Sequence, residues 1–152
     1  MSKIVIKKSP MADTRSCDVS TVSKDQLLSS SIMHIADVRN GVFFLTQAML
    51  AQAATHDVTK LTDIDQFYSD FQTGFKEHTW WDKHKLVERH HLADGAGDDV
   101  NLIDVMEYLT DSVVAGKART GKLFPIQINS DILMRAFHNT VQMVTDAVEV
   151  ME

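Results

Sequence analysis

The sequence lacks the residues and segments on which several classes of protein depend. Its 152 residues include one cysteine, Cys17, so no internal disulfide can form and a cysteine-based zinc site is excluded. No run approaches the roughly 18 apolar residues of a membrane helix. No long apolar stretch follows Met1–Lys8, so we expect no signal peptide. We therefore expect a cytoplasmic protein.

The sequence also lacks an excess of basic residues. Its formal net charge is −6, whereas proteins that bind a nucleic-acid backbone usually carry a basic stripe. This argues against nucleic acid as a partner. A small phosphorylated partner remains compatible, because a bound metal ion reverses the local charge. The length suits one domain with one hydrophobic core.

The hydrophobic periodicity predicts an all-α fold. Residues 1–23 are expected to be a flexible N-terminal tail, in which Lys3–Lys8 forms a short edge strand or no regular structure. Residues 24–152 are expected to form a single compact bundle of about five helices. The expected helices are Lys24–Ala54, Thr62–Gln72, Thr79 to His90 or His91, Val100–Ala115, and Ser130 to the C-terminus. The expected N-terminal caps are Ser23 with Gln26, Thr62, Asp99 and Ser130.

Histidines and acids suggest a metal site. Six of the seven histidines lie between residues 34 and 91, and the adjacent pair His56-Asp57 follows the long first helix. Imidazoles and carboxylates are the usual ligands for Mn, Fe, Zn, Mg, Co or Ni. A hydrolytic site must also leave coordination positions open for water and substrate. The residues expected to hold metal are His34, His56, Asp57, His84, His91 and Asp111.

The third expected helix offers two interpretations. His84, Glu88 and His91 share one face at i, i+4 and i+7, and His90 points elsewhere unless the helix has already ended. In one interpretation Glu88 only supports the helix by pairing with lysines. In the other, His84 and one of His90 and His91 bind a second metal or the substrate phosphate, and one of them protonates the leaving group. The candidate catalytic residues are Asp57, His84, His90 and His91.

Charged residues further along the chain are candidates for supporting roles. Asp104, Glu107 and Asp111 share a face of the fourth expected helix, as a solvated stripe or as a ligand face. We choose Asp111 as the ligand and place Asp104 and Glu107 behind the ligands. Lys60, Lys117 and Arg119 are expected to bind phosphate oxygens, with plain solvent exposure as the alternative for each. His78 and His138 receive no role.

These residues resemble a known family. The order His34, His56-Asp57, Asp111 is similar to that of the HD-domain superfamily of metal-dependent phosphohydrolases, which are all-helical. The segment from Tyr108 to Asp111, followed by Arg119, resembles the closing motif of that superfamily. A closer similarity, over about residues 30–120, is to short uncharacterised HD-like proteins common in phage genomes. It rests on His34 with Val38, His56–Lys60, Phe67, Tyr68, Phe71, Trp81, His84, His90-His91, Met106, Glu107 and Asp111.

The resemblance implies a phosphohydrolase that acts on a nucleotide or related small phosphate ester through a metal-activated water. The implied cofactor is a divalent metal ion, one of Mn, Fe, Co, Ni, Zn or Mg. One alternative is a non-catalytic HD-like phage accessory or binding protein with a structural metal, and another is a di-iron oxygenase. The expected partner is a small molecule, with no membrane and no nucleic acid. A homodimer formed through apolar positions of the last helix remains an open alternative.

Overall fold

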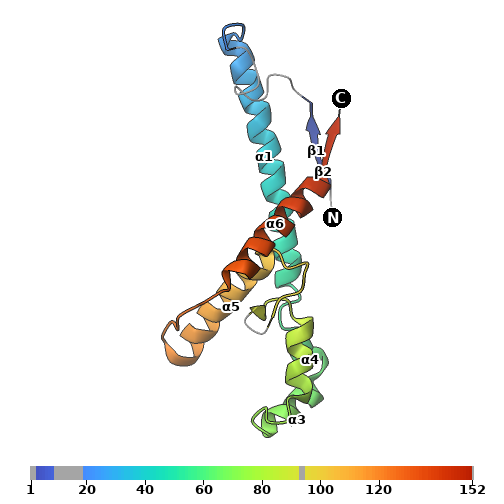
Figure 1. The fold of residues 1–152 in the computed structure, drawn as a ribbon, viewed down its shortest axis with the longest axis vertical. Helices are drawn as coiled ribbons and strands as arrows, with labels where there is room; N and C mark the ends of the chain where they lie inside the picture. Colours follow the sequence, from blue (N-terminus) through green and yellow to red (C-terminus); the bar gives the residue numbers. More distant parts are fainter. Residues whose placement is uncertain (1–2, 9–18, 93–94, 152) are drawn as a thin grey trace. The chain divides into compact units, whose positions relative to one another are not determined.

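The computed structural model of the chain describes residues 3–8, 19–92 and 95–151. These residues form six α-helices and two short β-strands (Figure 1). The elements are β1 (Ile4–Lys7), α1 (Lys24–Ala53), α2 (Thr59–Thr62), α3 (Ile64–Gln72), α4 (Thr79–Val87), α5 (Leu102–Thr120), α6 (Ser130–Ala147) and β2 (Val148–Met151). The all-α prediction is confirmed. Among the described residues, no helix combines the length and apolar character needed to cross a bilayer.

The long first helix starts and stops almost where its sequence signals predict. The Ser23 N–H donates to Gln26 Oε1 at 2.9 Å, and the Gln26 N–H donates to Ser23 Oγ at 3.3 Å. This reciprocal pair satisfies two backbone donors that a helix start otherwise leaves without partners. The helix ends at Ala53, one residue before the expected Ala54.

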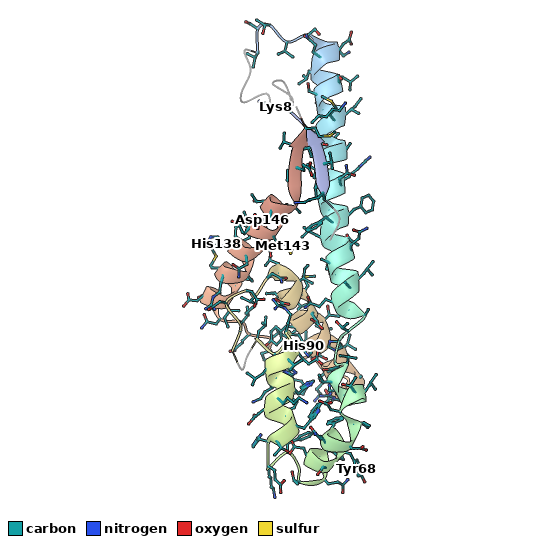
Figure 2. All side chains as sticks on the ribbon, turned by 90° about the vertical axis from the view of Figure 1, so that its right-hand side faces the viewer. Lys8, Tyr68, His90, His138, Met143 and Asp146 are labelled. Atoms are coloured by element: carbon teal, nitrogen blue, oxygen red, sulfur yellow. The ribbon has the colours of Figure 1, made fainter. Side chains whose placement is uncertain are left out.

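The described residues divide into two units. Unit 1 comes from residues 1–49 and 142–152, and unit 2 from residues 50–141. In unit 1, β1 pairs in parallel with β2, with Ile4 opposite Val148. Ile4, Phe44 and Ala147 are buried and form its core, against which Met143 packs (Figure 2).

Unit 1 contains two strands, of which the sequence left one undecided and predicted the other to be helical. Residues 4–7 are a strand rather than irregular, and the side chain of Ile4 is buried. Residues 148–151 were expected to continue the last helix, but they form β2. The valines at 148 and 150 favour an extended chain because β-branched side chains fit a strand better than a helix. Residues 9–18 of the expected tail, with Cys17, lie outside the described residues.

Unit 2 has a hydrophobic core and an aromatic cluster. Leu92, Val100 and Ala136 are the buried members of the core. In the aromatic cluster the rings of Phe67 and Trp80 lie 4.3 Å apart, centroid to centroid. The side chains of this cluster lie on α3 and α4, so they hold the third and fourth helices together.

Several helix ends in unit 2 differ from the expected ones. The second expected helix, Thr62–Gln72, is α3, which starts two residues later at Ile64; the short helix α2 before it was not expected. Helix α4 ends at Val87 because the backbone of Glu88 is extended. Helix α5 starts at Leu102 and runs to Thr120, five residues beyond the expected Ala115. Its start is capped by Asn101, not by Asp99, and the side chain of Asn129, not of Ser130, accepts from the Asp131 N–H at 2.7 Å.

Candidate metal centre

The His56-Asp57 pair lies in the turn between α1 and α2. Asp57 has a φ of 55°, a left-handed conformation that aspartate tolerates better than most residues. In this turn the two neighbouring side chains approach each other instead of pointing apart as they would in a strand. His56 Nε2 lies 3.5 Å from Asp57 Oδ2. The backbone of the turn therefore brings an imidazole nitrogen and a carboxylate oxygen into one space.

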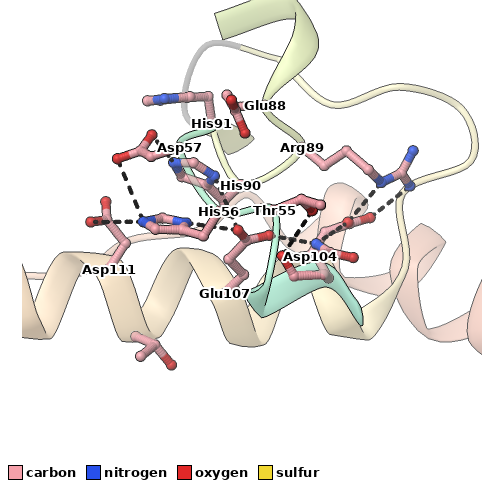
Figure 3. A network of polar contacts seen from close by, with 12 residues as sticks. Thr55, His56, Asp57, Glu88, Arg89, His90, His91, Asp104, Glu107 and Asp111 are labelled. Atoms are coloured by element: carbon pink, nitrogen blue, oxygen red, sulfur yellow. Dashed lines mark hydrogen bonds and ion pairs between the residues drawn. The ribbon is translucent and has the colours of Figure 1, made fainter. Parts of the chain in front are cut away.

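Helix α5 supplies two acids to the same imidazole. The His56 Nδ1–H donates to Glu107 Oε1 at 2.7 Å, and His56 Nε2 lies 3.8 Å from Asp111 Oδ1 (Figure 3). Because Nδ1 carries the proton in this hydrogen bond, a neutral His56 has its lone pair on Nε2. That lone pair faces the carboxylates of Asp57 and Asp111, which is the orientation of a metal-binding imidazole.

The His84 imidazole is held in the same way, by a different chain of hydrogen bonds. Thr59 Oγ donates to Glu88 Oε1 at 2.7 Å, and it lies 2.7 Å from His84 Nδ1. The single hydroxyl proton is used on Glu88, so Thr59 Oγ accepts from the His84 Nδ1–H. The lone pair of a neutral His84 is therefore on Nε2, which lies 3.3 Å from Asp57 Oδ1.

The two remaining histidines reach the site because α4 has already ended. The turn at residues 88–91 folds back, and His91 Nε2 lies 2.9 Å from His84 Nε2. His90 is buried, with Nε2 3.6 Å from Asp57 Oδ1 and Nδ1 3.5 Å from Glu107 Oε1. Both histidines thus face the cluster, whereas a continuous helix would have turned His90 away.

The donor atoms form three overlapping groups that could each hold an ion. The groups are His56, His90 and Glu107; Asp57, His84 and His91; and Asp57, Glu88 and His90. Two ligands bound at about 2.1 Å to one ion lie roughly 3.0–3.5 Å apart. The separations of 3.3 Å between Asp57 and His84 and 2.9 Å between His84 and His91 are close to this range. The residues therefore fit a small divalent cation.

Burial and charge set the protonation of the central residues. Burial raises the pKa of the Asp57 carboxyl, but the hydrogen bond and the charge of Lys60 outweigh it, so this pKa lies below its usual value. Burial lowers the pKa of His84, more than the neighbouring Asp57 carboxylate raises it. Both shifts favour the forms that bind metal, an ionised carboxylate and a neutral imidazole.

Most of the expected site residues meet in this cluster. His56, Asp57, His84, His90, His91 and Asp111 all contribute donor atoms to it, and Lys60 donates a hydrogen bond to Asp57. His34 is exposed on α1 in unit 1 and belongs to none of the three groups. Its role as a ligand stays a prediction. Lys117 and Arg119 are exposed near the end of α5.

Some residues differ from their expected roles or were not singled out. Glu88 is buried and accepts hydrogen bonds from Thr59, so the interpretation that it only pairs with lysines is wrong. Asp104 binds Arg89 through a pair of hydrogen bonds, both 2.8 Å long. Nothing in the sequence distinguishes Thr59 or Arg89 from other threonines and arginines. Their roles depend on contacts between distant segments.

Comparison with known proteins adds no relative: no protein-family model, no curated protein and no solved structure matches this chain. The chemistry of the cluster is therefore the basis for any statement about function.

Proposed function

We propose that this chain binds one or two divalent metal ions at the His56-Asp57 cluster and hydrolyses a small phosphate ester there. The observation that carries the proposal is one buried carboxylate oxygen that has no donor and lies beside two imidazole nitrogens. Asp57 Oδ1 is buried and has no hydrogen-bond donor among the described residues. The Nε2 atoms of His84 and His90 lie 3.3 and 3.6 Å from it.

Such an arrangement is unfavourable without a positive charge in its midst. A buried polar atom without a partner costs about 1–3 kcal/mol, and more when the group is charged. In His84 the hydrogen bond to Thr59 places the ring proton on Nδ1, so Nε2 has no proton to give to Asp57. A cation between these atoms would satisfy the carboxylate and the imidazole together.

The number of ligands supports a catalytic site over a purely structural one. Structural metal sites are usually closed by four protein ligands, whereas catalytic sites leave a position for water or substrate. Each of the three overlapping groups holds three ligand atoms, and Asp57 and His90 each belong to two of the groups. When bound, the ion would supply a nucleophilic water at neutral pH and stabilise charge on the phosphoryl oxygens. The chain's own share is to orient the imidazoles, through Glu107 and Thr59, and to place a cationic Lys60 beside Asp57.

The proposal that the chain is an HD-like phosphohydrolase rests on the same residues. In that family resemblance His34 would complete the ligand set with His56, Asp57 and Asp111. The structure supports the last three as neighbours, with His56 at the centre. The nature of the ester, a nucleotide or a related small phosphate, belongs to the resemblance alone.

The proposal is tested by measuring metal affinity first and hydrolysis of phosphate esters second. We expect titration calorimetry with Mn²⁺ to give tight binding to the wild type. Asp57→Asn, which keeps the size of the side chain and tolerates the left-handed turn, should weaken binding at least tenfold, as should His84→Gln. His138→Gln, an exposed histidine on α6, is the matched control and should change nothing. His34→Gln tests the ligand that the family resemblance adds: a loss of affinity as large as in His84→Gln would include His34 in the ligand set, and an unchanged affinity would exclude it.

Hydrolysis is measured next, on a panel of nucleotides and simple phosphate esters with added Mn²⁺, Co²⁺, Ni²⁺ or Mg²⁺. Metal binding that is unchanged in Asp57→Asn would refute the site. Tight binding without turnover of any ester would favour the non-catalytic alternative, a binding protein with a structural metal. Stoichiometric iron with visible absorption would favour the di-iron alternative.

A further inference from the structure

A cavity of about 320 Å³ lies beside the cluster, between α5 and the segment that follows it. The segment lies against the helix at Gly116, which is buried. A Cβ atom there would lie 3.0 Å from the Lys122 carbonyl oxygen and 3.7 Å from the Phe124 ring. Beyond the cavity, the Tyr108 hydroxyl donates to the Gln127 carbonyl oxygen at 2.9 Å. The cavity is thus bounded by a helix and by a segment fixed to it at two points.

The walls of the cavity combine an acid, a base, hydroxyl groups and apolar side chains. Asp111 and Arg119 are its two ionisable side chains apart from the phenol of Tyr108. The apolar part of the wall comes from Ala115, Phe124, Pro125 and Ile126, and Ser112 and Thr120 add hydroxyl groups. Within the described part of the chain, the Arg119 guanidinium has no ion-pair or hydrogen-bond partner, and Lys117 does not line the cavity. An aromatic ring fits the apolar walls, and an anion fits the guanidinium.

Asp111 belongs to the cavity and to the metal cluster, since its Oδ1 lies 3.8 Å from His56 Nε2. Arg119 lies eight residues further along the same helix, so their Cα atoms are about 12 Å apart. Both side chains line the same cavity, so the guanidinium and the Asp111 carboxylate face one space. A molecule whose phosphate is at the metal cluster would therefore meet Arg119 roughly 8–12 Å from its phosphorus.

We propose that this cavity binds the leaving group of the phosphate ester, and that the preferred leaving group is a flat ring carrying a second anion, which pairs with Arg119. The proposal rests on the proposed hydrolase function. In the reaction, the oxygen of water bonds to phosphorus while the bond from phosphorus to the ring-bearing oxygen breaks. That oxygen takes a proton from the attacking water. The products are inorganic phosphate and a hydroxylated ring that keeps its anion, and no further reactant is needed.

The test compares two probes that differ only in the second anion, phenyl phosphate and 4-carboxyphenyl phosphate. With the Mn²⁺-loaded protein, we expect kcat/KM to be at least tenfold higher for the carboxylated ester. Arg119→Met should remove this preference by raising KM for that ester, with little effect on phenyl phosphate. Lys122→Met removes a positive charge three residues further along, outside the cavity lining, and should keep the preference.

The outcomes separate this inference from the proposed function. Two results would contradict the role of the cavity: equal kcat/KM values for both probes in the wild type, or an equal loss of kcat/KM for both probes in Arg119→Met. Neither result would contradict the proposed hydrolase function. A loss of preference in Lys122→Met as large as in Arg119→Met overturns it too, because general charge attraction would then account for the effect. Failure of the metal-loaded protein to hydrolyse either probe, or any ester of the wider panel, overturns both proposals.

Discussion

At the scale of single residues, the cluster depends on the side chains that orient its imidazoles. Glu107 accepts from His56 Nδ1, and Thr59 stands behind His84. Hydrogen bonds of this kind fix which ring nitrogen carries the proton and which way the ring faces. Because the Nδ1 atoms of His56 and His84 are already in use, their Nε2 atoms are the ones that face the cluster. The cluster is therefore set up by its surroundings before any ion arrives.

This arrangement leads to a prediction for Glu107. Replacing it with alanine frees the His56 ring to rotate, so we expect Mn²⁺ affinity to fall about 10–100-fold. Glu107→Gln keeps an acceptor oxygen for the His56 Nδ1–H and should retain more of the affinity than Glu107→Ala. Calorimetry measures both. Glu77→Ala, at an exposed acid of unit 2, controls for the lost charge. An Mn²⁺ affinity in Glu107→Ala equal to that of the Glu77 control would contradict the positioning role.

The residues of the site were easier to predict than their arrangement. A histidine or acid beside apolar helical positions is visible in the sequence, which is why His56, Asp57, His84 and Asp111 could be singled out. The position of His90 could not be fixed, because it depends on α4 ending at Val87. No strong breaker marks that end; the extended Glu88 is held by Thr59, 29 residues earlier. A contact between distant segments thus decides which histidines face the cluster.

At the scale of elements, α5 carries both the acids of the metal cluster and one wall of the cavity. Its start is fixed by a reciprocal pair: the Asn101 side chain accepts from the Ile103 N–H at 2.8 Å, and Asp104 accepts from the Asn101 N–H at 2.8 Å. The rotation of the helix about its axis follows from this start, and with it the direction of Glu107 and Asp111. Asp104 is also held by Arg89, whose pKa is raised chiefly by that hydrogen bond.

Two alanine variants compare the observed N-cap of α5, Asn101, with the N-cap expected from the sequence, Asp99. Asn101→Ala should lower the free energy of unfolding by about 1 kcal/mol, the usual cost of losing a helix N-cap. Asp99→Ala should cost less, because Asp99 is exposed and its pairing with Arg89 is of the surface kind. Urea denaturation followed by far-UV circular dichroism measures both variants. A larger loss in Asp99→Ala would mean that the helix start is held differently.

The difference between the expected and the observed cap has a physical reason. Aspartate and asparagine are both good N-caps, and both precede the apolar run of α5. The residue three positions on distinguishes them, since Asn101 has Asp104 there whereas Asp99 has Leu102. The usual reciprocal partner is glutamate or glutamine, so an aspartate in that place is a weak signal in sequence. By contrast, Ser23 with Gln26 follows the common pattern, and the start of α1 was predicted correctly.

At the scale of the whole molecule, unit 1 joins segments from opposite ends of the chain. The strand pairing and the burial of Ile4 against Phe44 and Ala147 make its core. The all-α prediction holds for most of the chain because helical periodicity is repeated many times. Periodicity is a weak signal for the two strands because each has only four residues and neither has a partner nearby in sequence.

Unit 1 can be destabilised at a point outside the metal cluster. Ile4→Ala removes most of a buried side chain and should cost about 2–4 kcal/mol in that unit. Val5→Ala, on the next residue of the same strand, should cost under about 1 kcal/mol, because Val5 is 43% exposed. Far-UV circular dichroism reports both units, whereas both tryptophans lie in unit 2. We expect Ile4→Ala to lower the dichroism midpoint more than the tryptophan-fluorescence midpoint. Equal costs for the two variants would contradict this packing of β1.

The parallel pairing of β1 with β2 has a consequence for how the chain is made. A ribosome adds Val148, the partner of Ile4 across the ladder, more than 140 residues after Ile4 itself. All of residues 50–141 are translated in the interval, so unit 2 can fold while β1 is still unpaired. During that time the edge of β1 and the side chain of Ile4 are uncovered, and a chaperone that shields apolar segments would have its binding site there.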